Sequence, residues 1–494
     1  MLRKTRLFLA VVFFVLITLL LLDFTGTLHH WLGWMARIQV MPAILALNAV
    51  AIVVLVALTL VFGRVYCSVI CPLGVLQDIV ARLSRKRRRN RYSYSPAKRW
   101  LRYSLLALMV VAVAAGLGSL MALLDPYGNY GRIATNIFQP VYIWINNGLA
   151  AVAGHYESYA FYNKAVWLRS LPTLAIAVAM LVLVAVLAWR GGRTYCNTLC
   201  PVGTLLGELS RFSLLKVRFD ADKCRSCSLC SKGCKASCID FESHKVDYTR
   251  CVACGDCIDR CKFDALHYGR PRRKPAADDA PAGAPDKARR AVLLGTAIVA
   301  ADVALAQAGK KVDGGLAAIE NKQQPKRNTP ITPPGSVSAK LMTRRCTACQ
   351  LCVQQCPNEV LRPSSGLMTL MQPVMSYERG FCRPECVRCS EVCPTGAIQP
   401  IGRDEKSAIQ IGHAVYLKQN CVIFTDSVAC GNCARHCPAG AIEMVPDDPN
   451  DELSEMRPAV NPARCIGCGA CEYVCPARPF SAIYVEGHEV HNQI

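Results

Sequence analysis

Eight of the nine cysteines in residues 224–261 have a spacing that could bind metal. They form two runs of the pattern Cys-x2-Cys-x2-Cys-x3-Cys. Three thiolates at this spacing wrap one corner of a cubane iron–sulfur cluster, and the fourth cysteine of each run serves the neighbouring cluster. Zinc is the alternative, because Cys-x2-Cys pairs also bind zinc, but four zinc ligands do not explain why the third and fourth cysteines recur at the same offsets. The predicted sites are Cys224, Cys227 and Cys230 with Cys261, and Cys251, Cys254 and Cys257 with Cys234.

Four more quartets follow in the last third of the chain, each ending in Cys-Pro. The second and third widen only the first gap, to x3 and x8. Pro-Thr-Gly-Ala-Ile and Pro-Ala-Gly-Ala-Ile after two of them predict turns into short strands, as in ferredoxin units. The spacing leaves open how these quartets exchange fourth cysteines. We therefore expect about six [4Fe–4S] clusters, one for each quartet. The quartets are Cys346, Cys349, Cys352 and Cys356; Cys382, Cys386, Cys389 and Cys393; Cys421, Cys430, Cys433 and Cys437; and Cys465, Cys468, Cys471 and Cys475.

Five cysteines remain outside the quartets. Cys238 lies four residues after Cys234 and is an alternative fourth ligand. The other four form two Cys-x3-Cys-Pro pairs, Cys67 with Cys71 and Cys196 with Cys200. Residues i and i+4 share a helix face, so each pair presents two thiols together. A redox pair, a contact surface near a cluster, and a structural helix end marked by proline all remain open.

The 29 cysteines and the net charge of +22 exclude several classes of protein. The chain is long and its cysteines fall in quartets, which favours metal ligation over a secreted disulfide framework. No nucleic-acid-binding motif accompanies the charge, so we expect no nucleic-acid partner. No Cys-x2-Cys-His, phosphate-binding loop or Gly-x-Gly-x2-Gly fingerprint occurs, and no histidine lies within an expected membrane span. The sequence indicates electron transfer without a nucleotide site or haem.

Four apolar stretches predict an α-helical membrane domain before the first two clusters. A short leading helix could be a cleaved signal peptide, but no convincing cleavage site follows it. We also expect an interfacial helix near Val141–Ala153. The predicted spans are Leu7–Leu22, Met41–Phe62, Tyr103–Leu124 and Leu171–Trp189.

The positive charge is confined to this first part. Residues 309–494 carry 19 basic and 18 acidic side chains, which leaves 38 and 17 for residues 1–308. With the N-terminus inside, the outer loops hold only Arg37, Arg132, Lys164 and Arg169. The positive-inside rule therefore places the first ferredoxin unit in the cytoplasm of a bacterium.

A weaker apolar stretch, Ala291–Ala308, is interrupted by Asp302 and preceded by Arg289-Arg290. We expect it to form a fifth span that carries the last domain to the periplasm, with a cytoplasmic helix as the alternative. The predicted fold class is an α-helical membrane domain of four to five transmembrane helices with α+β ferredoxin-like domains. The predicted divisions are a membrane domain at 1–210, a two-cluster ferredoxin at 211–268, a linker at 269–290, the fifth span at 291–308, a linker at 309–340 and a four-cluster domain at 341–494.

These motifs carry a family resemblance. Residues 1–268, with their four spans, both Cys-x3-Cys-Pro motifs and the double ferredoxin unit, resemble the NapH family of membrane ferredoxin subunits of periplasmic nitrate reductase systems. Residues 289–494 resemble the NapG family of exported four-cluster partners, and Arg289-Arg290-Ala-Val-Leu-Leu resembles part of a twin-arginine signal.

The resemblance implies an inner-membrane protein that takes electrons from the quinone pool and passes them through clusters to a periplasmic reductase or carrier. Candidate quinol contacts are His29, His30 and Arg37, for which an ordinary polar belt at the membrane surface is the alternative. One rival function is an assembly or regulatory ferredoxin of a respiratory enzyme. The other is an electron hub that faces only the cytoplasm.

Overall fold

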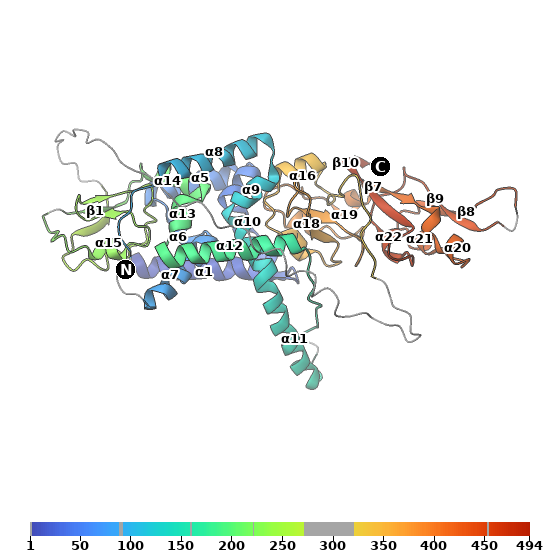
Figure 1. Cartoon of the computed structure of the whole chain (residues 1–494), viewed down its shortest axis with the longest axis horizontal. Coiled ribbons are helices and arrows are strands. Elements are labelled where there is room, and N and C mark those ends of the chain that lie inside the picture. The colour runs from blue at the N-terminus through green and yellow to red at the C-terminus, as the bar shows by residue number, and fades with distance from the viewer. Residues whose placement is uncertain (1, 88–91, 159–160, 221, 271–320, 452–453) are drawn as a thin grey trace, which may run out of the picture.

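The first part of the chain is a helical bundle, and a ferredoxin-like unit lies at each end of it (Figure 1). The structure is a computed structural model that describes residues 2–87, 92–158, 161–220, 222–270, 321–451 and 454–494. The expected span at 291–308 and the arginine pair before it lie outside these ranges. In chain order, the helical elements are α1 (Leu2–Leu22), α2 (Thr27–Leu32), α3 (Trp34–Arg37), α4 (Val40–Leu45), α5 (Ala49–Phe62), α6 (Val65–Val69), α7 (Pro72–Arg87), α8 (Arg99–Ala115), α9 (Gly118–Leu124), α10 (Pro126–Ile133), the π-helix η1 (Ala134–Phe138), α11 (Gln139–His155), α12 (Leu171–Gly191), α13 (Thr194–Thr198) and α14 (Pro201–Ser210).

Two of the described helices, α1 and α12, are long and apolar enough to cross a membrane. They coincide with the first and fourth predicted spans. Only 28% of the apolar window in α1 and 22% of that in α12 is buried. A core helix of a soluble protein is buried on most sides, whereas most of these two apolar windows is exposed.

The second and third predicted spans are each broken into two helices, which differs from the expectation of four continuous spans. Leu47, between α4 and α5, has a φ of 53°, and the Asn48 side chain caps α5 by accepting from the Ala51 amide at 3.1 Å. Between α8 and α9, Gly116 has a φ of 73°. A Cβ at Gly118 would lie 2.0 Å from the Thr343 carbonyl oxygen. Residues in the left-handed backbone conformation end helices. The C-terminal unit packs closely against the second break, between α8 and α9.

The helix predicted near Val141–Ala153 is present as α11. It projects away from the bundle (Figure 1). Its outer side chains include Trp144 and Ile145, which are 67% and 59% exposed.

The first ferredoxin unit closes on a pair of strands that enter and leave it. β1 pairs antiparallel with β4, with Lys216 opposite Gly269. Val217, Ile239 and Leu266 are buried together with several of the cysteines. Its elements are β1 (Lys216–Phe219), α15 (Leu229–Gly233), β2 (Ile239–Asp240), β3 (Lys245–Val246) and β4 (Leu266–Gly269).

The C-terminal unit is built from short helices and two-stranded sheets. Its longest strands, β7 and β10, are antiparallel, with Ile483 opposite Tyr416. The strand predicted after the third quartet is present, because β8 begins at Ile442, whereas Ile398 after the second quartet lies in no strand. Its elements are α16 (Ala339–Arg345), α17 (Leu351–Gln355), β5 (Leu361–Pro363), β6 (Pro373–Met375), α18 (Arg388–Glu391), α19 (Arg403–Ser407), β7 (Ile409–Tyr416), the 3-10 helix η2 (Lys418–Asn420), α20 (Val422–Thr425), α21 (Asn432–Arg435), β8 (Ile442–Pro446), β9 (Met456–Val460), α22 (Ala470–Val474) and β10 (Ile483–Gln493).

The two units contact opposite ends of α1. Near its start, Arg3 pairs with Asp256 of the first ferredoxin unit at 3.0 Å. At its end, the Gln354 amide donates to the Leu22 carbonyl oxygen at 3.2 Å. At 1.5 Å per residue, about 30 Å of helix separates these contacts. An electron passing between the units must therefore cross the helical bundle.

Candidate metal centres

The first ferredoxin unit brings together the ligands predicted for its first site, which we call site N1. Cys224, Cys227, Cys230 and Cys261 line one cavity, with aromatic side chains such as Phe263 around it. The crossed position of Cys261 agrees with the spacing argument. Its sulfur also accepts a hydrogen bond from the Ala265 amide at 3.3 Å.

The second site, N2, gathers Cys251, Cys254 and Cys257 around Cys234. Cys254 and Cys257 are both within electrostatic range of Cys234. The sulfur of Cys238 lies 3.6 Å from that of Cys234. The hydrogen bond between the two sulfurs lowers the pKa of the Cys234 thiol to about 7 and raises that of the Cys238 thiol. Cys238 also contacts Cys251, so Cys234 and Cys238 both lie where the fourth ligand of site N2 would be.

In the C-terminal unit, the fourth cysteine of each quartet lies near cysteines of a neighbouring quartet, a point that the spacing had left open. Cys346 and Cys349 interact with Cys393, and Cys382 and Cys389 interact with Cys356. The resulting sites are C1, with Cys346, Cys349, Cys352 and Cys393, and C2, with Cys382, Cys386, Cys389 and Cys356.

The last two quartets cross in the same way. Cys421, Cys430, Cys433 and Cys475 line one cavity. Cys465 and Cys468 interact with Cys437. We call the set Cys465, Cys468, Cys471 and Cys437 site C3, and the set Cys421, Cys430, Cys433 and Cys475 site C4. Sites C2 and C3 are adjacent, because the Cys382 amide donates to the Cys468 carbonyl oxygen at 2.9 Å.

The sulfur environments of these sites fit iron–sulfur clusters. At N1, C1, C3 and C4, the crossed cysteine accepts a backbone N–H at 3.2–3.4 Å, from a residue four to seven positions later. The four crossed cysteines are Cys261, Cys393, Cys437 and Cys475. Such N–H···S bonds stabilise thiolate ligands and tune cluster potentials. Most of the quartet cysteines are buried or half-buried, which keeps water from the sulfurs.

The two Cys-x3-Cys-Pro pairs meet inside the helical bundle. Cys67, Cys71, Cys196 and Cys200 are each 4% exposed, and Cys200 lies within electrostatic range of the other three. The two pairs lie 129 residues apart in the sequence, and only the tertiary fold of the bundle brings them together.

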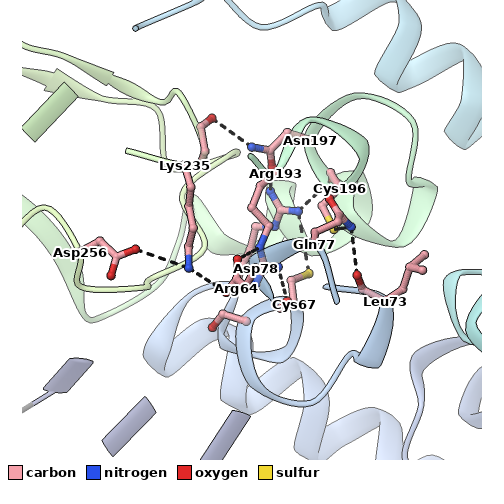
Figure 2. Close-up of polar contacts among 12 residues, drawn as sticks. Arg64, Cys67, Leu73, Gln77, Asp78, Arg193, Cys196, Asn197, Lys235 and Asp256 are labelled. Atoms are coloured by element: carbon pink, nitrogen blue, oxygen red, sulfur yellow. Dashed lines mark hydrogen bonds and ion pairs between the residues drawn. The ribbon is translucent and has the colours of Figure 1, made fainter. Parts of the chain in front are cut away.

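A network of charged and polar side chains lies beside these cysteines and was not predicted from the sequence (Figure 2). Asp78 accepts from Arg193 at 2.7 Å and pairs with Lys235 at 2.7 Å. The Gln77 amide donates to the sulfur of Cys196 at 3.1 Å. One sequence feature could have indicated this network: an arginine precedes the first cysteine of each pair by three residues, at Arg64 and Arg193.

The candidate quinol contacts lie at the boundary with the C-terminal unit. Arg37 donates to the Glu391 carbonyl oxygen at 3.2 Å, and His29 also contacts the Glu391 backbone. Glu391 is two residues from Cys389 of site C2. His30 is exposed and lies edge-on to Trp31. The structure therefore places His29 and Arg37 together beside a cluster site and leaves His30 apart from them.

Family models of iron–sulfur proteins match most of the regions that carry these cysteines. A 4Fe-4S binding domain matches residues 44–91 and again residues 173–220. Another 4Fe-4S binding domain matches 244–267, and 4Fe-4S dicluster domains match 345–398 and 428–478. The match at 345–398 covers every cysteine of C1 and C2, and the match at 428–478 covers those of C3 and C4 except Cys421.

Several curated proteins are similar to parts of the chain. The ferredoxin-type protein NapG of Escherichia coli is 31% identical over 177 residues, which is 33% of this chain and 75% of NapG. The ferredoxin-type protein NapH of the same organism is 27% identical over 234 residues, 46% of this chain and 68% of NapH. The methylamine utilization ferredoxin-type protein MauM of Methylobacillus flagellatus is 30% identical over 152 residues, 30% of this chain and 64% of MauM. The chain thus spans somewhat less than two thirds of MauM and more of the other two.

Proposed function

The chain belongs to the NapH/NapG-like family of 4Fe–4S ferredoxin-type proteins, and from this premise we propose that it is a membrane relay that passes electrons from quinol to a periplasmic acceptor. The observation that carries the proposal is the placement of two ferredoxin-like units at opposite ends of one helical bundle. A soluble ferredoxin needs no such separation, whereas a protein with clusters on both sides of a membrane does.

The membrane position rests on apolar surface and charge. The exposed flanks of α1 and α12 would face lipid, with the broken helices α4–α5 and α8–α9 beside them. Broken helices are tolerated at membrane depth where protein covers them. The excess of basic residues in the first 308 positions supports a cytoplasmic position for sites N1 and N2 under the positive-inside rule. The nearly neutral C-terminal unit would then lie in the periplasm.

The clusters would supply one-electron transfer, and the chain holds and tunes them. The cysteine thiolates fix each cluster, the backbone N–H groups favour the more negative reduced state, and burial excludes water. The adjacency of C2 and C3 gives a continuous path through the C-terminal unit.

Quinol would bind near α2 and α3. His29 could accept a proton released from the quinol, and Arg37 would orient the head group. Their common contact at Glu391 sets this position next to site C2, so an electron leaving the quinol would have a nearby cluster to enter.

The proposal is tested with purified protein in detergent, given a short-chain quinol under anaerobic conditions. We expect the cluster absorbance to bleach and reduced-cluster EPR signals to appear. The His29→Phe variant should slow this reduction, while His155→Phe, at the far end of α11, serves as the matched control. Reduction by a soluble ferredoxin but by no quinol would instead favour the cytoplasmic hub.

Topology is tested separately with spheroplasts. Protease added outside should remove the C-terminal unit and leave sites N1 and N2 protected. A C-terminal unit that resists outside protease and is cut only after lysis would contradict the transmembrane relay.

A further inference from the structure

The helical bundle contains a short internal repeat whose two copies meet. The shared pattern is Gly-Arg-x-Tyr-Cys-x3-Cys-Pro-x-Gly. In each copy, a short helix carries the first cysteine and a proline starts the next helix after the second cysteine. The copies run from Gly63 to Gly74 and from Gly192 to Gly203. We propose that Cys67, Cys71, Cys196 and Cys200 together bind one further [4Fe–4S] cluster, which we call the bundle cluster.

Each copy of the repeat is tied to the other by its arginine. Arg64 donates to the Cys196 carbonyl oxygen at 3.2 Å, and Arg193 donates to the Cys67 carbonyl oxygen. The glycine two positions after each proline leaves space for the arginine of the other copy and for the carbonyl oxygen that it binds. A Cβ at Gly74 would lie 2.3 Å from the Cys67 carbonyl oxygen, and one at Gly203 would lie 2.3 Å from that of Cys196. The two cysteine pairs are therefore held in one fixed arrangement.

All four sulfurs have an N–H donor. Gln77 donates to Cys196 at 3.1 Å, and the Gly203 amide donates to Cys200 at 3.3 Å. The Arg64 guanidinium lies 3.8 Å from the Cys67 sulfur, and the Gly74 amide donates to Cys71. Sites N1, C1, C3 and C4 surround their crossed cysteines with similar donors. Donors of this kind would stabilise thiolates that bind a metal.

The buried positive charge of Arg64 also favours an anionic group at this site. Arg64 is fully buried and donates to Asn197, the Thr249 carbonyl oxygen and Cys196, and within the described residues no carboxylate pairs with it. Its Nε has no partner. A buried cation is costly unless a negative charge lies nearby. Four thiolates around an iron–sulfur core carry a net negative charge and would supply it.

A single metal ion and a cubane cluster require different separations of the four sulfurs. In the part of the chain that the structure describes, no three His, Cys, Asp or Glu side chains come close enough to share one metal ion. This holds equally for the six ferredoxin sites. Four sulfurs around one zinc ion would lie only about 3.8 Å apart, from a Zn–S bond of about 2.3 Å. A cubane sets its four ligands farther apart, one at each iron.

The bundle cluster would lie between sites N2 and C1. On one side, Arg64 donates to the Thr249 carbonyl oxygen, two residues before Cys251 of N2, at 2.9 Å. On the other side, Tyr195 is within electrostatic range of Cys200 and of Asp125, which caps α10. Arg132 of α10 then donates to the Ala348 carbonyl oxygen at 3.3 Å, and Ala348 lies between Cys346 and Cys349 of site C1.

This position would divide the crossing of about 30 Å between the ferredoxin units into two shorter transfers. In each transfer, one cluster is oxidised by one electron as its neighbour is reduced by one, and no atom or proton moves. The relay role rests on the proposed function, whereas the metal site does not.

The site is tested by iron and sulfide analysis with Mössbauer spectroscopy of the full-length protein, purified without oxygen. Wild type should hold about seven cubanes, or about 28 irons at four per cluster. The double variant Cys67→Ser with Cys196→Ser should lose four irons and four sulfides and keep the six ferredoxin signals. Thr198→Ala, whose hydroxyl bonds only within its own short helix α13, is the matched control. An unchanged iron count, or zinc or copper recovered in place of iron, would overturn the proposal.

A second variant covers the case in which the double variant does not fold. Gln77→Leu removes one hydrogen bond to a cluster sulfur and keeps every ligand. It should leave the iron count unchanged and shift one centre to a more negative potential in a redox titration. A titration identical to that of wild type would count against a cluster at this place.

The site and the relay can fail independently. If quinol reduces none of the clusters in a protein that holds seven, the proposed function fails and the bundle cluster stands. If the double variant loses four irons but both ferredoxin units are still reduced at the wild-type rate, the cluster exists and its relay role is wrong.

Discussion

The two ends of the helical bundle hold their ferredoxin units by different means. At the first unit, buried charges meet: Asp78 binds Arg193, Lys235 and Arg6, and Lys235 also approaches Asp256 at 3.5 Å. At the C-terminal unit, side-chain donors bind main-chain carbonyl oxygens. Gln354 reaches Leu22, Gln355 reaches Asp23, and Arg388 reaches Thr25.

This difference has a physical consequence. A buried ion-pair network loses several kcal/mol when one partner is removed, because the remaining charges stay in a poorly solvated place. A hydrogen bond to a carbonyl oxygen costs less to lose, since the oxygen alone is left unpaired. The first unit should therefore depend on a few charges, and the C-terminal unit on many small contacts.

The largest effect should come from the crossed ligands, which both units share. Cys475→Ser should abolish the cluster of site C4 and leave that of C3, just as Cys261→Ser should abolish N1 and leave N2. The measurement is EPR of the reduced protein, with Ser481→Ala as the control beside Cys475. Loss of the C3 signal instead would show that the C-terminal unit binds its clusters differently from the first.

The next largest effect should follow from Asp78→Asn. Three buried cations would lose their shared carboxylate, and the expected cost is about 3–5 kcal/mol. Hydrogen exchange should report opening of residues 222–268, with the C-terminal unit unaffected. Asp259→Asn, which breaks the exposed pair with Arg3 at 3.0 Å, is the matched control and should cost at most about 1 kcal/mol. Equal exchange in the two variants would remove the contrast between the ends.

A smaller effect is expected from Gln355→Leu at the other end. The Gln355 amide donates to the Asp23 carbonyl oxygen at 2.6 Å, and its loss leaves that oxygen buried and unpaired. The expected cost is about 1–3 kcal/mol. Faster exchange near Asp23 should be nearly independent of salt. A cost as large as that of Asp78→Asn would mean that this end is held no more diffusely than the first.

The smallest expected effect is a difference between the two ends in how their free energy of unfolding depends on pH. Burial lowers the pKa of His491 to about 4 in the folded C-terminal unit, from an ordinary value near 6.5. The unfolded chain then binds the proton more readily, so stability falls as the pH drops below about 6.5. Between pH 7.5 and 5.5 the C-terminal unit should lose about 1 kcal/mol of unfolding free energy.

The first unit should not respond in this range. Burial opposes ionisation of Asp78, but the attraction of Arg193 and Lys235 is stronger and holds its pKa well below the ordinary value. The stability from this group is lost only as the pH falls below about 4, where the unfolded carboxyl takes up a proton. Denaturation at the two pH values, with His491→Asn against the exposed His436→Asn, measures the contrast. A pH response that survives in His491→Asn would place its origin elsewhere.

The features that could be predicted from the sequence are local ones. The cysteine quartets follow from spacing alone, because three ligands of each cluster lie within one short loop. The crossed positions of Cys261 and Cys234 followed from the same rule. The helices α1 and α12 followed from continuous apolar composition. In each case the deciding residues are neighbours in the chain.

Tertiary structure decided what depends on distant segments. The break at Gly116 and Gly118 accommodates Thr343, more than 200 residues away, and hydropathy carries no trace of that contact. The exchange of Cys437 with Cys475 required the fold of two loops around each other. From the sequence, Cys67 and Cys196 belong to two separate motifs. In the structure, Arg64 and Arg193 link these motifs by hydrogen bonds. A sequence motif fixes ligands that one loop can supply, whereas a site shared by two distant helices exists only once the bundle has formed.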